Sequence, residues 1–78
     1  MAQQGSVLEV RLARFCEHHD ISIRERDIVQ GMLEGKSNRQ MAGDLFISEG
    51  TVKAHAHSIY KKCGVSSRKE VQQLFWSE

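Results

Sequence analysis

The 78-residue sequence predicts one all-α domain, and three observations lead to this expectation. Apolar residues recur at helical spacing, and no segment alternates apolar and polar side chains as a half-buried strand does. Proline is absent, so no predicted helix is interrupted by a residue without an amide donor. Three serines, Ser22, Ser37 and Ser67, are each followed three residues later by glutamate or glutamine. That spacing is the capping-box pattern of a helix start.

The first two helices are predicted before residue 35. The first spans about Val7 to His18, whereas the polar residues 1–6 are left out of the fold as a flexible start or a cloning remnant. Asp20 to Ser22 end this helix, and the capping box at Ser22 opens the next, which runs to about Glu34. Gly35 suits the left-handed residue that ends it. The apolar faces of these two helices are expected to consist of Leu8, Leu12, Phe15, Ile28, Val29, Met32 and Leu33.

Three further helices follow along the chain. A capping box at Ser37 opens a short helix that stops near Phe46. After a brief turn, Ser48 is a good N-cap for a longer helix through Lys62, which Gly64 ends. The last helix opens at the third capping box. The inward-facing residues of these helices are expected to be Met41, Ala42, Leu45, Val52, Ala56, Ile59, Cys63, Val71, Leu74 and Phe75.

Charge is unevenly distributed along the chain. The net charge is only +1, yet the segment from Lys36 to Lys69 carries seven basic and two acidic side chains. This half of the chain is therefore the candidate for contact with an anionic partner. No apolar run approaches the roughly 20 residues of a membrane span. Cys16 and Cys63 fall at apolar helical positions, which favours reduced thiols and a cytoplasmic location.

The third and fourth predicted helices, Asn38 to Lys62, form a helix-turn-helix candidate. With its apolar stripe inward, the longer helix presents small and basic side chains that suit close approach to a major groove. Free amides at both helix starts are natural phosphate sites. The outward residues are Gly50, Lys53, Ala54, His57 and Lys61, and the helix starts contribute Lys36, Asn38, Arg39 and the amides of residues 49–51.

Four ordered segments carry a resemblance to a known family. They are Ile23–Val29 (IRERDIV), Gly35–Ala42 (GKSNRQMA), Ile47–His55 (ISEGTVKAH) and Ile59–Arg68 (IYKKCGVSSR). Together they resemble the LuxR/FixJ/GerE-type DNA-binding domain, over about Ile21 to Phe75. The resemblance implies a bacterial transcription regulator with a four-helix LuxR-type helix-turn-helix domain over residues 20–78, preceded by a short linker-like helix over residues 7–19. It also implies that the third helix of that domain enters the major groove and that the last helix can dimerise.

The resemblance implies roles for individual residues. Lys53, Ala54 and His57 take base-facing positions, in a recognition helix over about residues 49–62. The residues expected to lie near phosphates or to position the motif are Lys36, Ser37, Asn38, Arg39, Thr51, His55 and Lys61. In the last helix, the apolar residues exceed one narrow stripe and either cap the small core or form a dimer interface. These residues are Val71, Leu74, Phe75 and Trp76.

The expected partner is double-stranded DNA, as an inverted-repeat operator bound by a homodimer, with RNA polymerase as a further candidate partner. No metal or other cofactor is expected. His55 and His57 point to different faces of one helix, and Cys16 with His19 lacks further ligands nearby in the sequence. No phosphate-binding glycine loop, nucleophile elbow or paired carboxylates are present, so an enzyme is not expected.

Two alternatives remain open from the residues alone. The lysines of the fourth helix also fit a solvated face. A helical protein-interaction module with only non-specific DNA affinity is the other class considered, although such a module has no need of lysines at both helix starts. The chain is expected to be either a small stand-alone regulator or the output module of a longer protein.

Overall fold

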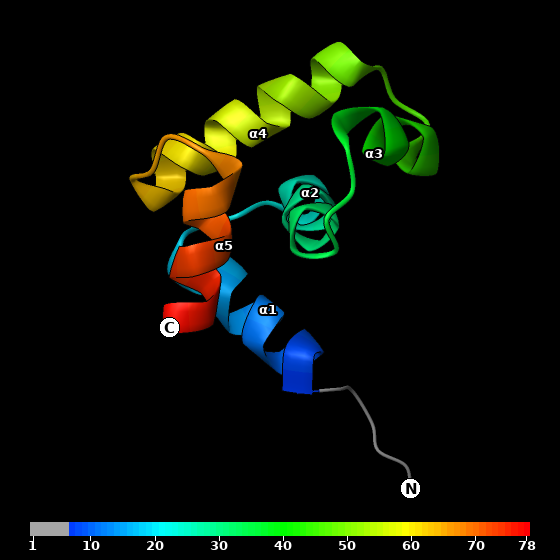
Figure 1. The fold of residues 1–78 in the computed structure, drawn as a ribbon. Helices are drawn as coiled ribbons and strands as arrows, with labels where there is room; N and C mark the ends of the chain where they lie inside the picture. The colour runs from blue at the N-terminus through cyan, green and yellow to red at the C-terminus, as the bar shows by residue number, and fades with distance from the viewer. Residues whose placement is uncertain (1–6) are drawn as a thin grey trace, which may run out of the picture.

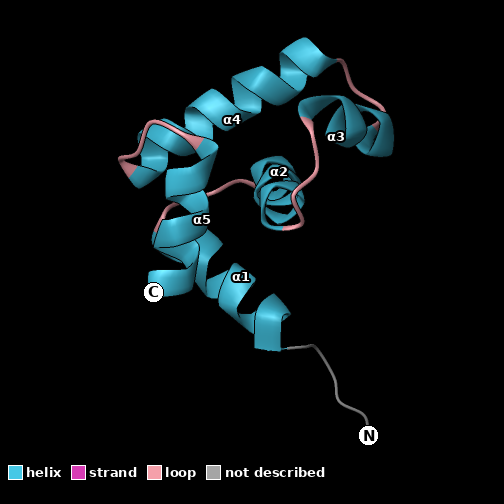
Figure 2. Ribbon diagram, in the orientation of Figure 1, coloured by secondary structure: helices cyan, strands magenta, loops and turns pink. Residues whose placement is uncertain are grey.

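The computed structural model describes residues 7–78, which form five helices and, within that range, no strand (Figures 1 and 2). The expected start at residues 1–6 lies outside the described residues. The predicted all-α class is confirmed, and every helix lies close to its predicted position. The helices are α1 (Val7–His18), α2 (Ile23–Leu33), α3 (Asn38–Leu45), α4 (Glu49–Cys63) and α5 (Arg68–Ser77).

Helix α2 lies at the centre of the core. In Figure 1 it is seen end-on, with α4 crossing above it and α1 and α5 lower in the view. Its Ile28, Val29 and Met32 are fully buried, and burying each such side chain stabilises the fold by about 1.5–3 kcal/mol. Each of the other helices adds one face to the same core. The remaining core residues are Leu12, Phe15, Cys16, Met41, Ala42, Val52, Ala56, Ile59, Val71 and Phe75.

Some residues predicted to face inward lie at the edge of the core instead. Leu33, Leu45, Cys63 and Leu74 are only partly buried. Leu8 is 40% exposed and borders a surface hollow that Leu33 and Trp76 also line. The apolar faces are therefore narrower than the sequence pattern alone indicates.

The capping boxes at Ser22 and Ser37 are both formed, as predicted. In each box the serine hydroxyl accepts a hydrogen bond from the backbone N–H three residues later. In return, the Glu25 carboxylate accepts from the Ser22 N–H at 2.9 Å, and the Gln40 side-chain oxygen accepts from the Ser37 N–H at 2.8 Å. These bonds satisfy amides that a helix start otherwise leaves unpaired.

The third predicted capping box is only half formed, so that prediction was wrong. The Ser67 hydroxyl accepts from the Glu70 N–H, but the Glu70 carboxylate accepts from the hydroxyls of Ser66 and Ser67. Ser66 supplies a competing donor, and the backbone of Ser67 is more extended than at the other two caps, with a φ of −150°. These carboxylate bonds lower the pKa of Glu70.

The helix ends use the left-handed conformation at four positions, of which Asp20, just after α1, has a φ of 59°. Gly35 and Gly64 have φ values of 77° and 70°, as the sequence predicted. Phe46, which ends α3, has a φ of 57° although it is not glycine, and this costs about 1–2 kcal/mol. Its side chain is 94% exposed.

None of the helices within residues 7–78 has both the length and the apolar character needed to cross a membrane.

The Met41 side chain of α3 lies against Gly31 of α2. A Cβ atom on Gly31 would lie 2.8 Å from Cγ of Met41 and closer still to its sulfur. Met41 is itself only 2% exposed, so it has little room to move away. The absence of a side chain at Gly31 therefore makes room for the buried Met41 side chain.

We expect Gly31→Ala to lower the free energy of unfolding by about 1–3 kcal/mol, because the added methyl group overpacks the contact with Met41. Urea unfolding followed by circular dichroism measures this. The matched control is Gly43→Ala in α3, where an added Cβ meets nothing within 4 Å. That change should leave stability unchanged or raise it by up to about 1 kcal/mol. Equal effects of the two substitutions would contradict the packing argument.

Candidate nucleic-acid interface

Helices α3 and α4 are joined by the three-residue segment from Phe46 to Ser48 and pack against each other. The Ser48 hydroxyl caps α4 by accepting from the Thr51 N–H at 3.0 Å, and it also lies 2.9 Å from the Thr51 hydroxyl. Thr51 therefore orders the start of α4 through both its backbone and its side chain. Glu49 and Gly50, which follow the cap, are exposed.

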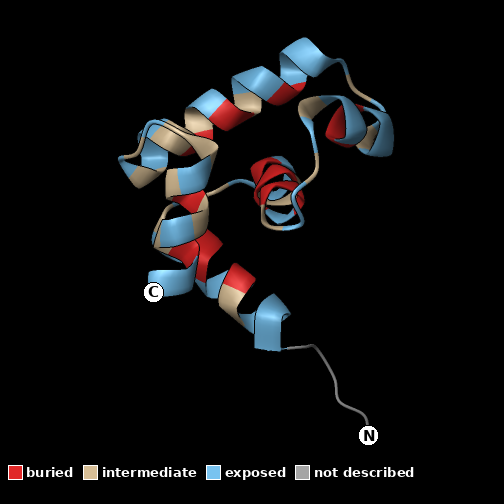
Figure 3. Cartoon of the chain, viewed as in Figure 1, coloured by how far each residue is buried: buried red, intermediate tan, exposed pale blue. Residues whose placement is uncertain are grey.

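The outer face of α4 is the side turned away from α2. Figure 3 shows this face exposed, while the buried residues of the helix line its inner side. The exposed residues on α4 include all those predicted to face outward, namely Gly50, Lys53, Ala54, His57 and Lys61. His55 lies at the edge and is partly buried. The structure thus brings the three predicted base-facing residues onto one exposed surface.

Basic residues near this surface differ in whether the chain itself engages them. Within residues 7–78, Lys53, Lys61 and Arg39 have no ionic or hydrogen-bonding partner, and the same holds for the imidazole of His57. Their charges and donors are therefore available to another molecule. By contrast, Lys36, Lys62 and Arg68 each contact other parts of the chain.

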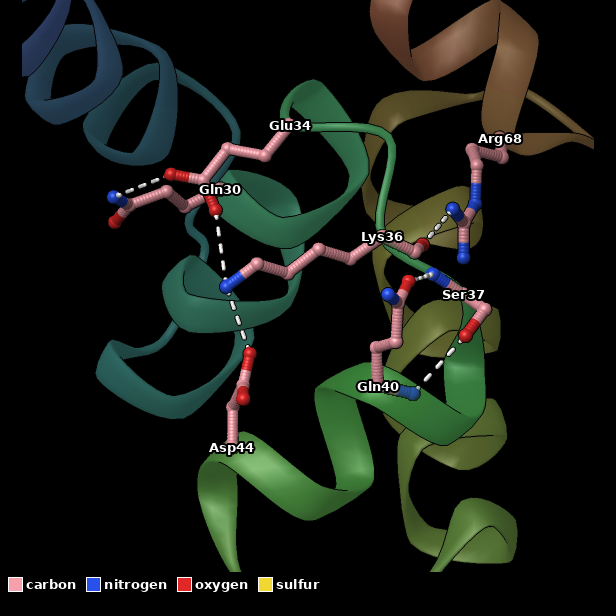
Figure 4. A network of polar contacts seen from close by, with 7 residues as sticks. All are labelled: Gln30, Glu34, Lys36, Ser37, Gln40, Asp44 and Arg68. Carbon is pink, nitrogen blue, oxygen red and sulfur yellow. Dashed lines mark hydrogen bonds and ion pairs between the residues drawn. The ribbon is translucent and has the colours of Figure 1, made fainter.

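Lys36 is paired with two carboxylates. Its Nζ lies 2.7 Å from the Asp44 carboxylate and 3.4 Å from that of Glu34. The hydrogen bond to Asp44 is the main reason that the pKa of Lys36 is raised. Figure 4 shows the ammonium directed toward these acids and away from the cap formed by Ser37 and Gln40. A phosphate contact by Lys36, as predicted from the sequence, requires it to leave Asp44.

Arg68 is a functional candidate that the sequence analysis did not single out. From the start of α5 its guanidinium donates to the backbone carbonyl of Lys36 (Figure 4). It also donates to Oδ1 of Asn38 at 3.0 Å. The start of α3 is thereby tied to the start of α5, and the Asn38 side chain is held in place. The contacts join residues 30 and 32 positions apart. No local pattern identifies such a pair.

A partly buried ion pair joins α2 to the end of α4. Glu25 is 5% exposed, and its carboxylate accepts from Nζ of Lys62 at 2.7 Å. Burial raises the pKa of Glu25, but hydrogen bonds from Lys62, the Ser22 backbone and Ser58 outweigh this and bring it to about 2. The same contact raises the pKa of Lys62. Lys62 thus stabilises the fold and does not belong to the unpaired basic surface.

The residues expected to form a dimer interface divide into two groups. Val71 and Phe75 are 0% and 2% exposed, because they belong to the chain's own core. Trp76 is 55% exposed, and Leu74 is partly buried. The surface that α5 offers to a partner therefore includes Leu74 and Trp76, whereas Val71 and Phe75 are not accessible.

Both cysteines are free, as the sequence interpretation expected. Cys16 is buried and Cys63 is partly buried. Burial raises the pKa of Cys16 and raises that of Cys63 to about 11, so both thiols stay protonated at neutral pH.

The chain is similar in sequence to known regulatory proteins. The model of the family described as "Bacterial regulatory proteins, luxR family" matches residues 19–75. The response regulator protein TmoT of Ectopseudomonas mendocina is 43% identical over 57 residues, which are 73% of this chain and 26% of that protein. The CsgBAC operon transcriptional regulatory protein of Escherichia coli (strain K12) is 41% identical over 54 residues, 69% of this chain and 24% of that protein.

The uncharacterized transcriptional regulatory protein YhcZ of Bacillus subtilis (strain 168) is 37% identical over 54 residues, which are 69% of this chain and 25% of that protein. The chain thus spans about a quarter of the length of these curated relatives. No solved structure was found to match it.

The Glu25–Lys62 pair predicts how stability depends on pH. Because the folded-state pKa of Glu25 is about 2 and its ordinary value is 4.5, the stabilisation is present above pH 4.5 and is lost as the pH falls toward 2. The shift corresponds to about 3 kcal/mol. Urea unfolding measured between pH 2 and pH 7 should show this loss. Glu25→Gln should be less stable at pH 7 and have a flatter profile. If the stability of Glu25→Gln depended on pH as steeply as that of the parent, the pH dependence could not be assigned to Glu25.

Proposed function

The chain belongs to the luxR family of bacterial regulatory proteins, and we propose that it binds double-stranded DNA sequence-specifically, with α4 in the major groove, as part of a transcription regulator. The observation that carries this proposal is the exposed outer face of α4, on which Lys53, His57 and Lys61 have no partner within the described chain. The small residues Gly50 and Ala54 allow close approach on the same face. A major groove is about 12 Å wide and admits a helix.

In this proposal Lys53 and His57 read base edges. Lysine pairs with the acceptors of guanine, and a neutral or protonated imidazole offers at least one donor. Ala54 offers a methyl contact to thymine. Since these side chains meet base edges, they would determine which sequence is preferred.

Phosphate contacts would set the position of the domain on the duplex. The amides at the start of α4, Thr51 and Lys61 would contact one part of the backbone. Arg39 and the amides at the start of α3 would contact another, and Arg68 would hold that start in place. Lys36 would exchange the Asp44 carboxylate for a phosphate, which is feasible because an exposed ion pair contributes little to stability.

We further expect two chains to bind an inverted-repeat operator as a dimer, because two-fold symmetric proteins match two-fold symmetric sites. The exposed Trp76 would contribute to the contact between chains. A regulator of this kind would act in the cytoplasm without a cofactor and without catalysis, with RNA polymerase as a further candidate partner.

The decisive experiment is selection from a randomised duplex pool at physiological salt, followed by sequencing. Enrichment of a two-fold-related motif supports specific recognition by a dimer. Binding without enrichment that vanishes as salt rises indicates phosphate attraction alone. The alternative of a protein-interaction module with only non-specific DNA affinity would then be favoured.

On the selected sequence, Lys53→Ala should weaken binding by about 1–3 kcal/mol and relax the preference at the bases it contacts. Arg39→Ala and Lys36→Ala should instead weaken binding to all duplexes alike, because phosphates carry no sequence information. Fluorescence anisotropy on specific and random duplexes measures both effects. Lys69→Ala is the control, since Lys69 is an exposed lysine on α5 outside the proposed surface. Equal losses on specific and random duplexes for Lys53→Ala would refute its base-reading role.

For the dimer, Trp76→Glu should yield complexes with one chain per operator in place of two, because it introduces a charge on the exposed surface of α5. Analytical ultracentrifugation of the DNA complex measures the stoichiometry. The control is Gln73→Glu, which adds the same charge at another exposed position of α5. Two chains bound per operator by Trp76→Glu would exclude this residue from the contact.

A further inference from the structure

The end of α1 and the end of α5 bring three metal-ligating side chains together. His18 and His19 lie where α1 ends, and Glu78 caps α5. Nε2 of His19 lies 2.8 Å from one carboxylate oxygen of Glu78, and Nδ1 of His18 lies 3.7 Å from the other. One ligand atom from each residue lies within 4.8 Å of the other two. We propose that these three residues form a zinc site. This proposal is independent of the proposed DNA binding.

The separations suit a zinc ion after a small adjustment. Zinc binds imidazole nitrogen at about 2.0–2.1 Å and carboxylate oxygen at about 2.0–2.2 Å. Tetrahedral coordination therefore places two donors about 3.4 Å apart. The Glu78 carboxylate oxygens lie 2.8 Å from Nε2 of His19 and 3.7 Å from Nδ1 of His18, and one ligand atom of each residue lies within 4.8 Å of the other two. Side-chain rotations of about an ångström would bring all three into coordination.

The chemistry of the donors points to zinc among the common cations. Two imidazoles and one carboxylate match the His2Glu set of open zinc sites, in which water occupies the fourth position. Calcium and magnesium prefer sites made of oxygen donors only. The His18 side chain is 70% exposed, so a water molecule has access to the fourth position. The expected site is therefore a tetrahedral zinc with three protein ligands.

Packing already orients two of the three ligands. The ring of His19 packs 4.6 Å from the ring of Phe15 and stacks on His18 with centroids 4.6 Å apart. The side chain of His19 is only 13% exposed. The Glu78 N–H donates to the Leu74 carbonyl, which anchors its backbone to α5. Less conformational entropy is then lost when a metal binds.

Two arginines lie near the three proposed ligands, in a surface hollow between α1 and α5. Arg11 and Arg14 line it together with His18 and Glu78. The Arg11 guanidinium lies over the rings of Phe75 and Trp76 at 5.5 and 5.3 Å, and it faces their backbone carbonyls. No ion pair joins either arginine to Glu78 within the described chain. The carboxylate thus faces the two imidazoles.

Zinc at this position would join the two helix ends that flank the domain. The ligands come together only when α1 packs against α5, so metal binding is coupled to that packing. An ion that binds only the folded form raises its stability in proportion to the logarithm of the metal concentration. A zinc ion bound at this site would thereby hold α1 against α5.

The test is calorimetric titration of the 78-residue chain with zinc chloride at pH 7.5, with thermal unfolding measured in parallel. We expect one zinc per chain, a rise in the melting temperature with zinc, and a sedimentation coefficient that stays that of a monomer. His18→Gln and Glu78→Gln should each weaken binding about ten-fold or more, equivalent to about 1.4 kcal/mol. Because neither side chain belongs to the core, these variants should fold normally, which circular dichroism verifies.

The controls are Glu17→Gln and His57→Gln, which remove an exposed carboxylate on α1 and an exposed imidazole on α4. Zinc affinity should not change in either. The proposal is overturned if zinc produces no heat and no thermal shift, which would leave only an ion pair between histidine and Glu78. It is equally overturned if His18→Gln and Glu78→Gln bind as well as the parent, or if one zinc joins two chains.

Discussion

Burial of α2 is the constraint on which the other helices depend. A chain of 78 residues buries only about 60% of its unfolded surface and has material for one core. That core is centred on Ile28, Val29 and Met32, which have no exposed surface. Every other helix contributes one face to it and leaves the opposite face in water. The outer side of α4 is exposed for this reason, and the proposed recognition surface is a consequence of how the core is built.

The helices and their ends were predictable because their signals are local. The serine caps, the glycines that follow α2 and α4 and the helical spacing of apolar residues all act within a few positions. The contacts that fix the helices relative to one another were not, since they join distant residues. Glu25 meets Lys62 across 37 positions, and Arg68 reaches Asn38 across 30. The third capping box failed for a local reason, because Ser66 offers a donor that the pattern did not consider.

On the outer face of α4, too, some features were predictable from the sequence and others were not. Its outward residues follow from helical periodicity, and the structure places Lys53, Ala54 and His57 together on an exposed face. Which cations remain available does not follow from the sequence. Lys36 and Lys62 are both engaged by acidic residues of the chain, so a count of basic residues overstates the charge offered to a partner. The basic residues of this surface that the described chain leaves unpaired are Lys53 and Lys61 on α4 and Arg39 near the start of α3.

The contact between Gly31 and Met41 has an evolutionary consequence. Because the Met41 side chain fills the space that a side chain on Gly31 would need, position 31 cannot become larger while position 41 keeps its size. A larger residue at position 31 is compatible with this fold only where position 41 becomes smaller. Drift at the two positions should therefore be correlated among homologous sequences that keep this packing, and a covariation signal between them would report on the contact between the two positions.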